Sequence, residues 1–174
     1  MEVTIIDPSV KKLDLEDQDV LARLLEIEHE TFRVHGPLYD ISAWGREQFL
    51  LPLERKLDFS LLICLSEVVG FSIAYEFRGG WAHISRVAIE PAVAGRGLGK
   101  ELLTAQLAKL REAGCKTCSI DVRMDNVAAT RLYRKLGFER MRDAALIGYV
   151  NERGRDPEEY LSTEPSHSAF QLYL

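Results

Sequence analysis

Hydrophobic residues occur along this chain in short apolar runs and in helical stripes that follow one another from end to end. The runs that predict β-strands are Val3–Ile6, Phe59–Leu65, Val68–Phe77, Ala82–Ile89, Thr117–Val122, Phe138–Val150 and Ala169–Leu174. The stripes that predict helices are Leu15–Val34, Ser42–Arg55, Glu101–Ala113 and a segment that begins at Asp125 or Asn126 and ends at Gly137. This order predicts an α/β fold: a mixed, mostly antiparallel sheet of about seven strands with helices on both faces.

Glycine, proline and polar residues mark the breaks between these elements. Gly36-Pro37 follows the first helix, and Arg78–Gly80 forms a turn between two strands. Gly137 is expected as a left-handed cap that ends the last helix. Val34–Ile41 is predicted to be a loop between the first two helices, and the polar segment Asn151–His167 is predicted to be a surface loop.

Length and composition are those of one soluble domain. The chain has 174 residues, of which 47% are hydrophobic and 28% charged, with no internal repeat or interdomain linker, so we expect a single domain over 1–174. The net charge of −5 argues against a nucleic-acid partner and favours a cationic or amine substrate. No apolar run has membrane-spanning length, and the N-terminus lacks the pattern of a signal peptide. We therefore expect a cytoplasmic protein without a membrane partner; the sequence leaves a homodimer open.

The three cysteines do not predict a metal or redox centre. Cys115 and Cys118 have C-x-x-C spacing, but zinc needs four ligands and the sequence has no second pair or histidine cluster. A redox pair would follow a strand at a helix start, whereas this pair comes at the entry to a strand. We expect buried structural thiols here and at Cys64, and no metal site.

A glycine-rich segment, Gly95–Lys100, joins the strand at Ala82–Ile89 to the following helix. Such a segment favours binding of an anion: the amides at a helix start are free, the helix dipole adds positive potential, and glycine lets the backbone approach the ligand. The Walker A pattern fails because Ala94 and Glu101 occupy two of its fixed positions, and the dinucleotide pattern fails at Lys100. A tight turn without a ligand is the alternative.

Two motifs carry a resemblance to a known family. Ala94–Gly99 is similar to Gln/Arg-x-x-Gly-x-Gly/Ala, the pyrophosphate loop of the GNAT superfamily of acyl-CoA-dependent N-acyltransferases; it departs from the pattern at Ala94. Asn126–Phe138 matches the second GNAT motif, N-x-x-A-x-x-L-Y-x-x-x-G-F, at every fixed position. The motifs occur in the family's order with a strand between them, so the chain resembles a GNAT domain.

This resemblance implies that acetyl-CoA is the acetyl donor. It implies a thioester and pantetheine facing the backbone of Val87, Ala88 and Ile89, a pyrophosphate on Gly95, Arg96, Gly97, Leu98, Gly99 and Lys100, and further donor contacts at Asn126 and Tyr133. Tyr133 is the expected general acid, because a phenol with a pKa of about 10 is protonated at neutral pH and can donate to a leaving thiolate. The alternative is a tyrosine buried for its ring, whose hydroxyl only touches the sulfur.

The general base is expected at His83, where many related enzymes place a glutamate on the strand before the glycine loop. A neutral imidazole could accept the amine proton directly or through water. A histidine that is packed on the strand and hydrogen-bonded locally is the alternative, with Glu76 or water as the base. Glu28 and Asp40 could instead recognise a substrate amine.

The function that the resemblance implies is N-acetyl transfer from acetyl-CoA to a primary amine, on a protein N-terminus or a small molecule, by direct attack in a ternary complex. With a base of pKa about 6.5, deprotonating an α-amine costs about 2 kcal/mol and a lysine about 5 kcal/mol, which favours an α-amine. A regulatory module that binds acyl-CoA without catalysis is the alternative; it predicts donor binding but no release of CoA.

Overall fold

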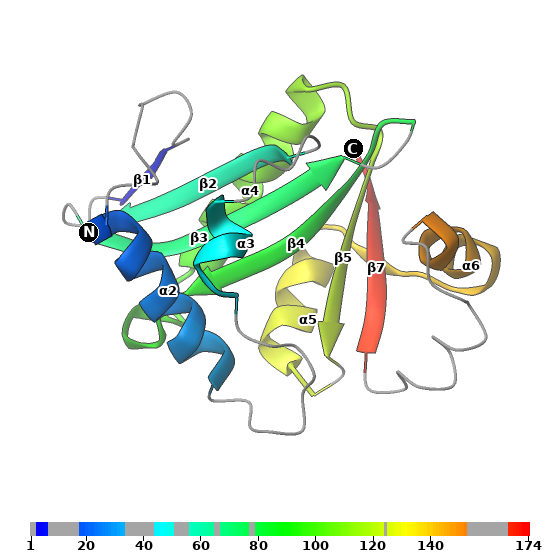
Figure 1. Ribbon diagram of the computed structural model, residues 1–174. Helices are drawn as coiled ribbons and strands as arrows, with labels where there is room; N and C mark the ends of the chain where they lie inside the picture. The colour runs from blue at the N-terminus through cyan, green and yellow to red at the C-terminus, as the bar shows by residue number, and fades with distance from the viewer. Residues whose placement is uncertain are drawn as a thin grey trace.

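The computed structural model describes residues 3–6, 18–33, 44–50, 56–64, 67–76, 79–123, 125–152 and 167–174. In these residues one mixed sheet runs in the order β1-β2-β3-β4-β5-β7-β6 (Figure 1). Its long strands are β2 (Lys56–Cys64), β3 (Glu67–Glu76), β4 (Trp81–Ile89), β5 (Thr117–Arg123) and β7 (His167–Tyr173). Short edge segments are β1 (Val3–Ile6) and β6 (Glu139–Arg140). Neighbouring strands are antiparallel except for β4 and β5, which are parallel.

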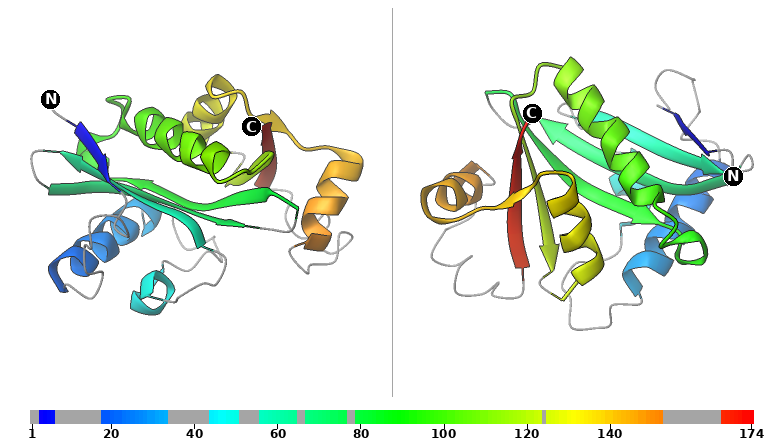
Figure 2. Two further views of the ribbon diagram at one scale, coloured as in Figure 1. Left: turned by 90° about the horizontal axis from the view of Figure 1, so that it is seen from above. Right: turned by 180° about the vertical axis from the view of Figure 1, so that it is seen from behind.

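Helices cover both faces of the sheet, as the sequence predicts (Figure 2). Helices α2 (Gln18–Arg33) and α3 (Arg46–Leu50) lie on one face, and α4 (Leu98–Glu112) and α5 (Val127–Lys135) lie on the other. Two main hydrophobic clusters fill the space between helices and sheet. Leu24 and Ile27 of α2 pack in the cluster that contains Phe71, and Leu103 of α4 packs in the cluster that contains Ile84.

The expected strand at Phe138–Val150 is wrong. Strand β6 contains only Glu139 and Arg140, and residues Asp143–Glu152 form helix α6. The physical reason is a helical rather than alternating spacing: Leu146, Tyr149 and Val150 lie at i, i+3 and i+4 and pack together in one cluster. In the described residues the sheet thus has five long strands, and the two strands that complete the expected seven, β1 and β6, are only short edge segments.

The second predicted helix, Ser42–Arg55, appears only as α3, Arg46–Leu50. Its expected cap Ser42 and its end at Arg55 lie outside the described residues, as do the loop Val34–Ile41 and residues 153–166 of the other predicted loop. Glu76 is described only as a strand residue, paired with Ala82.

Several local predictions are confirmed. Asn126 caps α5 through its side-chain oxygen, which accepts the Ala129 N–H at 3.0 Å, and Gly137 follows this helix at φ 93°. Cys115 and Cys118 are free and buried just before and within β5. Burial is the main cause that raises the pKa of the Cys118 thiol to about 12, so the thiol is unreactive at neutral pH.

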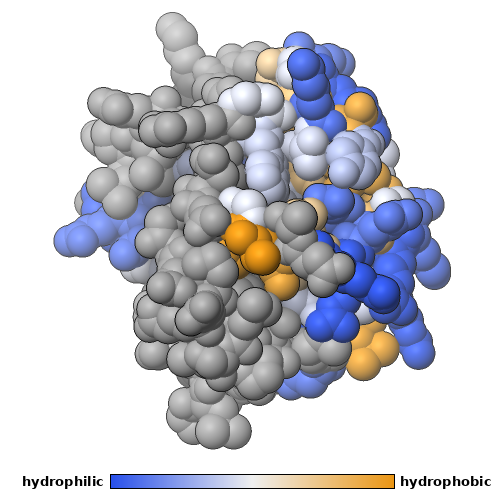
Figure 3. Space-filling model, turned by 90° about the vertical axis from the view of Figure 1, so that its right-hand side faces the viewer, coloured by the Kyte–Doolittle hydropathy of each residue, from blue (hydrophilic) through white to orange (hydrophobic). Residues whose placement is uncertain are grey.

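The surface of the described residues is predominantly polar. On the side of the molecule that carries α6, apolar atoms form small patches among hydrophilic ones (Figure 3). Within the described chain the exposed large hydrophobic residues are Val127, Ile147 and Tyr173, each on a different element. Among the helices that the structure describes, none has the length and apolar character needed to span a bilayer.

Candidate active site

The centre of the sheet opens between its two parallel strands. Pairing of β4 with β5 ends at Ile84 and Ile120, although β4 continues to Ile89 and β5 to Arg123. Figure 1 shows the two strands side by side at one end and apart at the other, with α5 across the opening. Beyond Ile84, one backbone edge of β4 therefore has no strand partner in the described chain. Unpaired N–H groups on such an edge can bind a ligand.

A β-bulge in β4 marks the point where the strands separate. Ile73 of β3 pairs with Arg86, and the next β3 residue, Ala74, pairs with Ile84, so Ser85 is an extra residue in β4. A bulge bends its strand and increases the local twist. Because Ser85 directly follows the last residue paired with β5, we infer that the bulge turns the end of β4 away from β5.

The glycine-rich segment presents a row of free amides beside this strand end. Helix α4 begins after Gly97, which has φ 88° and makes no side-chain cap, and Gly95 has φ 79°. Before this segment the chain turns through η1 (Pro91–Val93), and the Ala94 N–H donates to the Pro91 carbonyl. After it, the Lys100 N–H donates to the Gly97 carbonyl. The amides at 95–99 donate to no acceptor among the described residues. A Cβ atom added at Gly95 or Gly97 would meet nothing within 4 Å, so no described atom crowds these two positions.

The residues expected to hold the donor lie together. Val87, Ile89 and Leu98 pack in one cluster that joins the end of β4 to the start of α4. Gly99 lets the second motif approach closely, since its Cβ would lie 3.4 Å from Leu132 on α5. Arg96 and Lys100 are exposed on the same segment and add positive charge. This geometry, with open space and unsatisfied donors, fits an anion such as a pyrophosphate.

Tyr133 lies on α5 in the same core cluster as Ile84, and its exposed fraction is 6%. Its ring packs against Phe138 and Phe170. Burial, and to a lesser degree the charge of Asp121, raises the pKa of Tyr133 well above its usual 10. The phenol therefore stays protonated at neutral pH, but complete proton transfer to a thiolate is unfavourable, so its hydroxyl is best suited to donate a hydrogen bond to the sulfur.

His83 lies in a buried polar network on the opposite face of β4 from Ile84. Its exposed fraction is 3%, and its Nδ1 lies 3.0 Å from the Ser119 hydroxyl, which also accepts the Trp81 indole N–H at 3.0 Å. The ring of Tyr149, on α6, lies 5.7 Å from the imidazole. If the Nδ1–H group donates to Ser119, the lone pair is on Nε2, where a proton acceptor would need it.

Two residues of this face were missed by the sequence analysis. Tyr149 donates its hydroxyl to a carboxylate oxygen of Asp121 at 2.6 Å, and Asp121 lies near Tyr133, since its charge contributes to the raised tyrosine pKa. A signal for Asp121 existed in the alternation of β5, where Ser119 and Asp121 are polar and Cys118, Ile120 and Val122 are core residues. Tyr149 could not be assigned to this face from the sequence, because Phe138–Val150 was predicted as a strand rather than as helix α6.

Glu28 and Arg86 form a buried ion pair between α2 and β4. Both Nε and Nη2 of Arg86 donate to the same Glu28 oxygen, at 3.0 and 2.5 Å, and this oxygen also accepts the Trp44 N–H. The guanidinium lies 4.1 Å from the centre of the Phe32 ring. Glu28, expected as a possible contact for a substrate amine, thus has one oxygen committed to Arg86 and Trp44; Asp40 lies outside the described residues.

The predicted residues therefore fall into two groups on opposite faces. The glycine-rich segment, the end of β4 and Tyr133 pack with α4 and α5. His83 lies with Asp121 and Tyr149 on the other face, toward α6. Among the described residues, no cluster of His, Cys, Asp and Glu could hold a metal ion.

The sheet opens between two parallel strands, and free amides at a helix start lie beside this opening. A protein with this arrangement can bind an anionic ligand there. The sequence model of the acetyltransferase (GNAT) family matches residues 21–138, more than half of the chain. The chain belongs to this family, which confirms the resemblance seen in the two motifs.

Relatives of known name differ in how much of their length is matched. Acetyltransferase SG1711 of Sodalis glossinidius is 31% identical over 132 residues, covering 69% of this chain and 90% of that protein. Mycothiol acetyltransferase of Rhodococcus erythropolis is 46% identical over 54 residues, covering 31% of this chain. The chain spans 18% of the length of the Rhodococcus protein.

Solved structures share the fold over nearly the whole chain. PaiA N-acetyltransferase of Thermoplasma acidophilum, in complex with coenzyme A, has a TM-score of 0.72 at 18% identity and covers 100% of both chains. Ribosomal-protein-S18-alanine N-acetyltransferase of Escherichia coli has a TM-score of 0.67 at 22% identity, covering 99% of this chain and 94% of the other. At these identities the likeness shows the GNAT fold.

Proposed function

We propose that this protein is an N-acetyltransferase that moves an acetyl group from acetyl-CoA to a primary amine by direct attack in a ternary complex. The observation that carries the proposal is the row of free amides at 95–99 beside the unpaired edge of β4. Membership of the GNAT family and the coenzyme A bound to a structural neighbour support acetyl-CoA as the donor.

The donor pyrophosphate binds the amides of the glycine-rich segment, with Arg96 and Lys100 beside it. The thioester lies along the end of β4, where those backbone N–H groups among Val87, Ala88 and Ile89 that point away from β3 face the developing oxyanion. Preorganised backbone donors aimed at such charge contribute strongly to catalysis. Asn126 acts at this site by capping α5, which carries Tyr133.

In the reaction, the amine nitrogen attacks the thioester carbon, the C–S bond breaks and the thiolate leaves. Tyr133 hydrogen-bonds to the sulfur and stabilises the thiolate as it leaves, and the thiolate then takes up a proton from water. The amine proton passes to a base on the opposite face of the sheet. His83 is the first candidate for this base, through water because it is buried; Asp121 is the second, because its charge acts on Tyr133.

The acceptor is a primary amine on a protein N-terminus or on a small molecule. The carboxylate of Asp121 on the acceptor face favours a cationic amine over an anionic substrate, whereas the charge of Glu28 is compensated by Arg86. A protein N-terminus is supported by the fold shared with an enzyme named for a ribosomal-protein alanine. A small amine is supported by the short match to a mycothiol acetyltransferase.

The burial of His83 favours one other function, that of a module that binds acyl-CoA without transferring the acyl group. The two functions are distinguished by an acceptor screen with acetyl-CoA, in which free thiol is measured over N-terminal peptides, polyamines and amino acids. Thiol release that depends on an acceptor supports the enzyme. Donor binding by calorimetry without release, across all acceptors, would support the regulatory module.

A further inference from the structure

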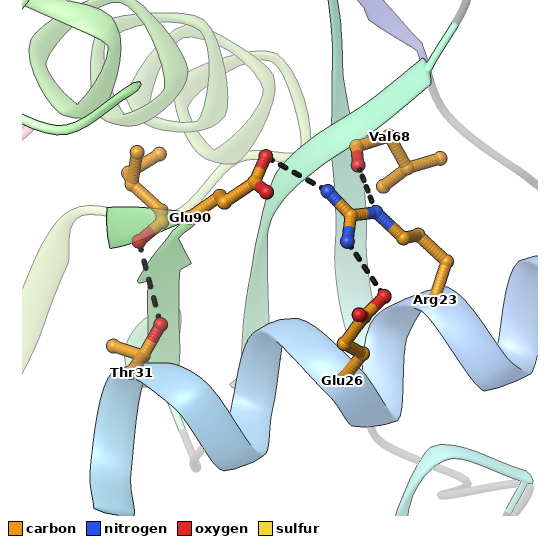
Figure 4. A network of polar contacts seen from close by, with 6 residues as sticks. Arg23, Glu26, Thr31, Val68 and Glu90 are labelled. Atoms are coloured by element: carbon orange, nitrogen blue, oxygen red, sulfur yellow. Dashed lines mark hydrogen bonds and ion pairs between the residues drawn. The ribbon is translucent and has the colours of Figure 1, made fainter. Parts of the chain in front are cut away.

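Arg23, on α2, binds three acceptors around the end of β4 (Figure 4). Its Nη2 lies 2.8 Å from the Glu90 carboxylate, its Nη1 lies 2.6 Å from Glu26, and its Nε donates to the Val68 carbonyl at 3.0 Å. The hydrogen bond to Glu90 is the largest of the causes that raise the pKa of Arg23, so the guanidinium is charged at any physiological pH. A planar guanidinium is suited to hold several acceptors in fixed directions.

A second contact from α2 holds the same strand end. The Thr31 hydroxyl donates to the Ile89 carbonyl at 3.3 Å, and the Glu90 N–H donates to the Val69 carbonyl of β3 at 2.8 Å. Arg23 and Thr31 are a little over two helical turns apart, about 12 Å along the axis. In Figure 4, Glu90 lies between them. The last residues of β4 are thus fixed from α2 at two points.

Glu90 lies at a sensitive position for the proposed donor site. It connects β4 to η1, and its carbonyl accepts the Val93 N–H at 3.1 Å. Ile89, its neighbour, comes within 3.8 Å of the Cβ position of Gly99 at the start of α4. A carboxylate at this corner repels an anionic pyrophosphate on the neighbouring amides unless a cation compensates it.

We propose that Arg23 is a positioning residue for the acyl donor: by pairing with Glu90 it compensates a negative charge beside the proposed pyrophosphate site. This inference rests on the proposed donor site at residues 95–99. Arg23 acts through Glu90 and touches neither substrate. With charges on the order of 10 Å apart in a partly solvated site, loss of the compensation weakens donor binding about three- to tenfold at low salt.

The test compares four variants for CoA and acetyl-CoA affinity by calorimetry at low and high salt. Arg23→Gln should raise Kd about three- to tenfold at low salt and less at high salt, with kcat at saturating acetyl-CoA within about twofold of the parent. Glu90→Gln should bind at least as tightly as the parent. The double variant Arg23→Gln/Glu90→Gln should recover to within about twofold, because the uncompensated charge is gone. Glu26→Gln is the matched control, since it removes the exposed partner of Arg23 and should leave affinity unchanged.

The outcomes separate this inference from the proposed function. A parent protein that binds neither CoA nor acetyl-CoA would overturn both. Two results would overturn the role of Arg23 while leaving the donor site intact. One is a parent protein that binds the donor and an Arg23→Gln variant with the same Kd. The other is a double variant whose donor affinity is as low as that of Arg23→Gln. If Arg23→Gln does not fold, Glu90→Gln decides: weaker binding by this folded variant contradicts the charge argument.

Discussion

Replacing Gly97 by alanine tests the donor site with a built-in control at the other end of the same helix. Gly97 precedes α4 at φ 88°, and Gly114 follows it at φ 84°, and an added Cβ meets nothing within 4 Å at either position. Alanine at a left-handed position costs about 1–2 kcal/mol. Gly97→Ala and Gly114→Ala should therefore lose similar stability, with Tm lower by roughly 2–8 °C in thermal unfolding.

Their effects on donor binding should differ. At Gly97 the new methyl group lies on the segment with free amides, where the pyrophosphate is proposed to bind, whereas Gly114 lies at the opposite end of α4. Loss of one hydrogen bond to a charged group costs about 1.5–3 kcal/mol. We expect calorimetry to show CoA binding about ten- to a hundredfold weaker in Gly97→Ala, with the parent affinity in Gly114→Ala.

The comparison can refute the argument in two ways. Equal CoA affinity in the two variants, at equal loss of Tm, would mean that the pyrophosphate does not bind these amides. Equal weakening in both would mean that strain in α4, rather than a contact, controls binding.

Three further substitutions test the other assignments. Tyr133→Phe should lower kcat by about a hundredfold with little change in CoA affinity; a parent-like rate in single-turnover measurements would remove the phenol from the mechanism. His83→Gln should lose the acidic limb that an imidazole base gives to kcat/KM, and a retained limb would assign His83 a structural role and direct the search to Asp121. Glu28→Gln leaves Arg86 buried without its counter-charge and should destabilise by about 3–5 kcal/mol in urea unfolding, against a change within about 0.5 kcal/mol for the exposed Glu26→Gln.

The fold was most predictable where the hydrophobic period was clear. Val3–Ile6 was predicted to the residue, and the strand at Ala82–Ile89 to within one residue of β4. Helix α6 was missed because Phe138–Val150 mixes apolar and polar residues without clear alternation, and its helical face is complete only when Trp81 and Ala169 are brought beside it. Tertiary packing, which periodicity alone does not contain, decided that segment.

The local structure of the glycine-rich segment was predictable from the sequence, whereas the surroundings of His83 were not. Backbone amides and glycines can be located from local spacing, because a strand, a turn and a helix start follow one another in the chain. The acceptor half is assembled from β4, β5 and α6, so the contacts of His83 with Ser119 and Tyr149 depend on the sheet order. Arg23 and Glu90 likewise meet only because α2 packs across the end of β4.

Strand β4 connects these two halves physically. The bulge at Ser85 separates its paired beginning, which carries His83 beside β5, from its unpaired end, which faces the donor segment. Because side chains alternate along a strand, the same strand can present Val87 and Ile89 toward α4 and Arg86 toward α2. Donor and acceptor groups can then approach from opposite faces and meet where β4 leaves β5. On this view α2 supports both parts of the strand, since Glu28 pairs with Arg86 on one face while Arg23 and Thr31 hold the residues at its end, beside the proposed donor site.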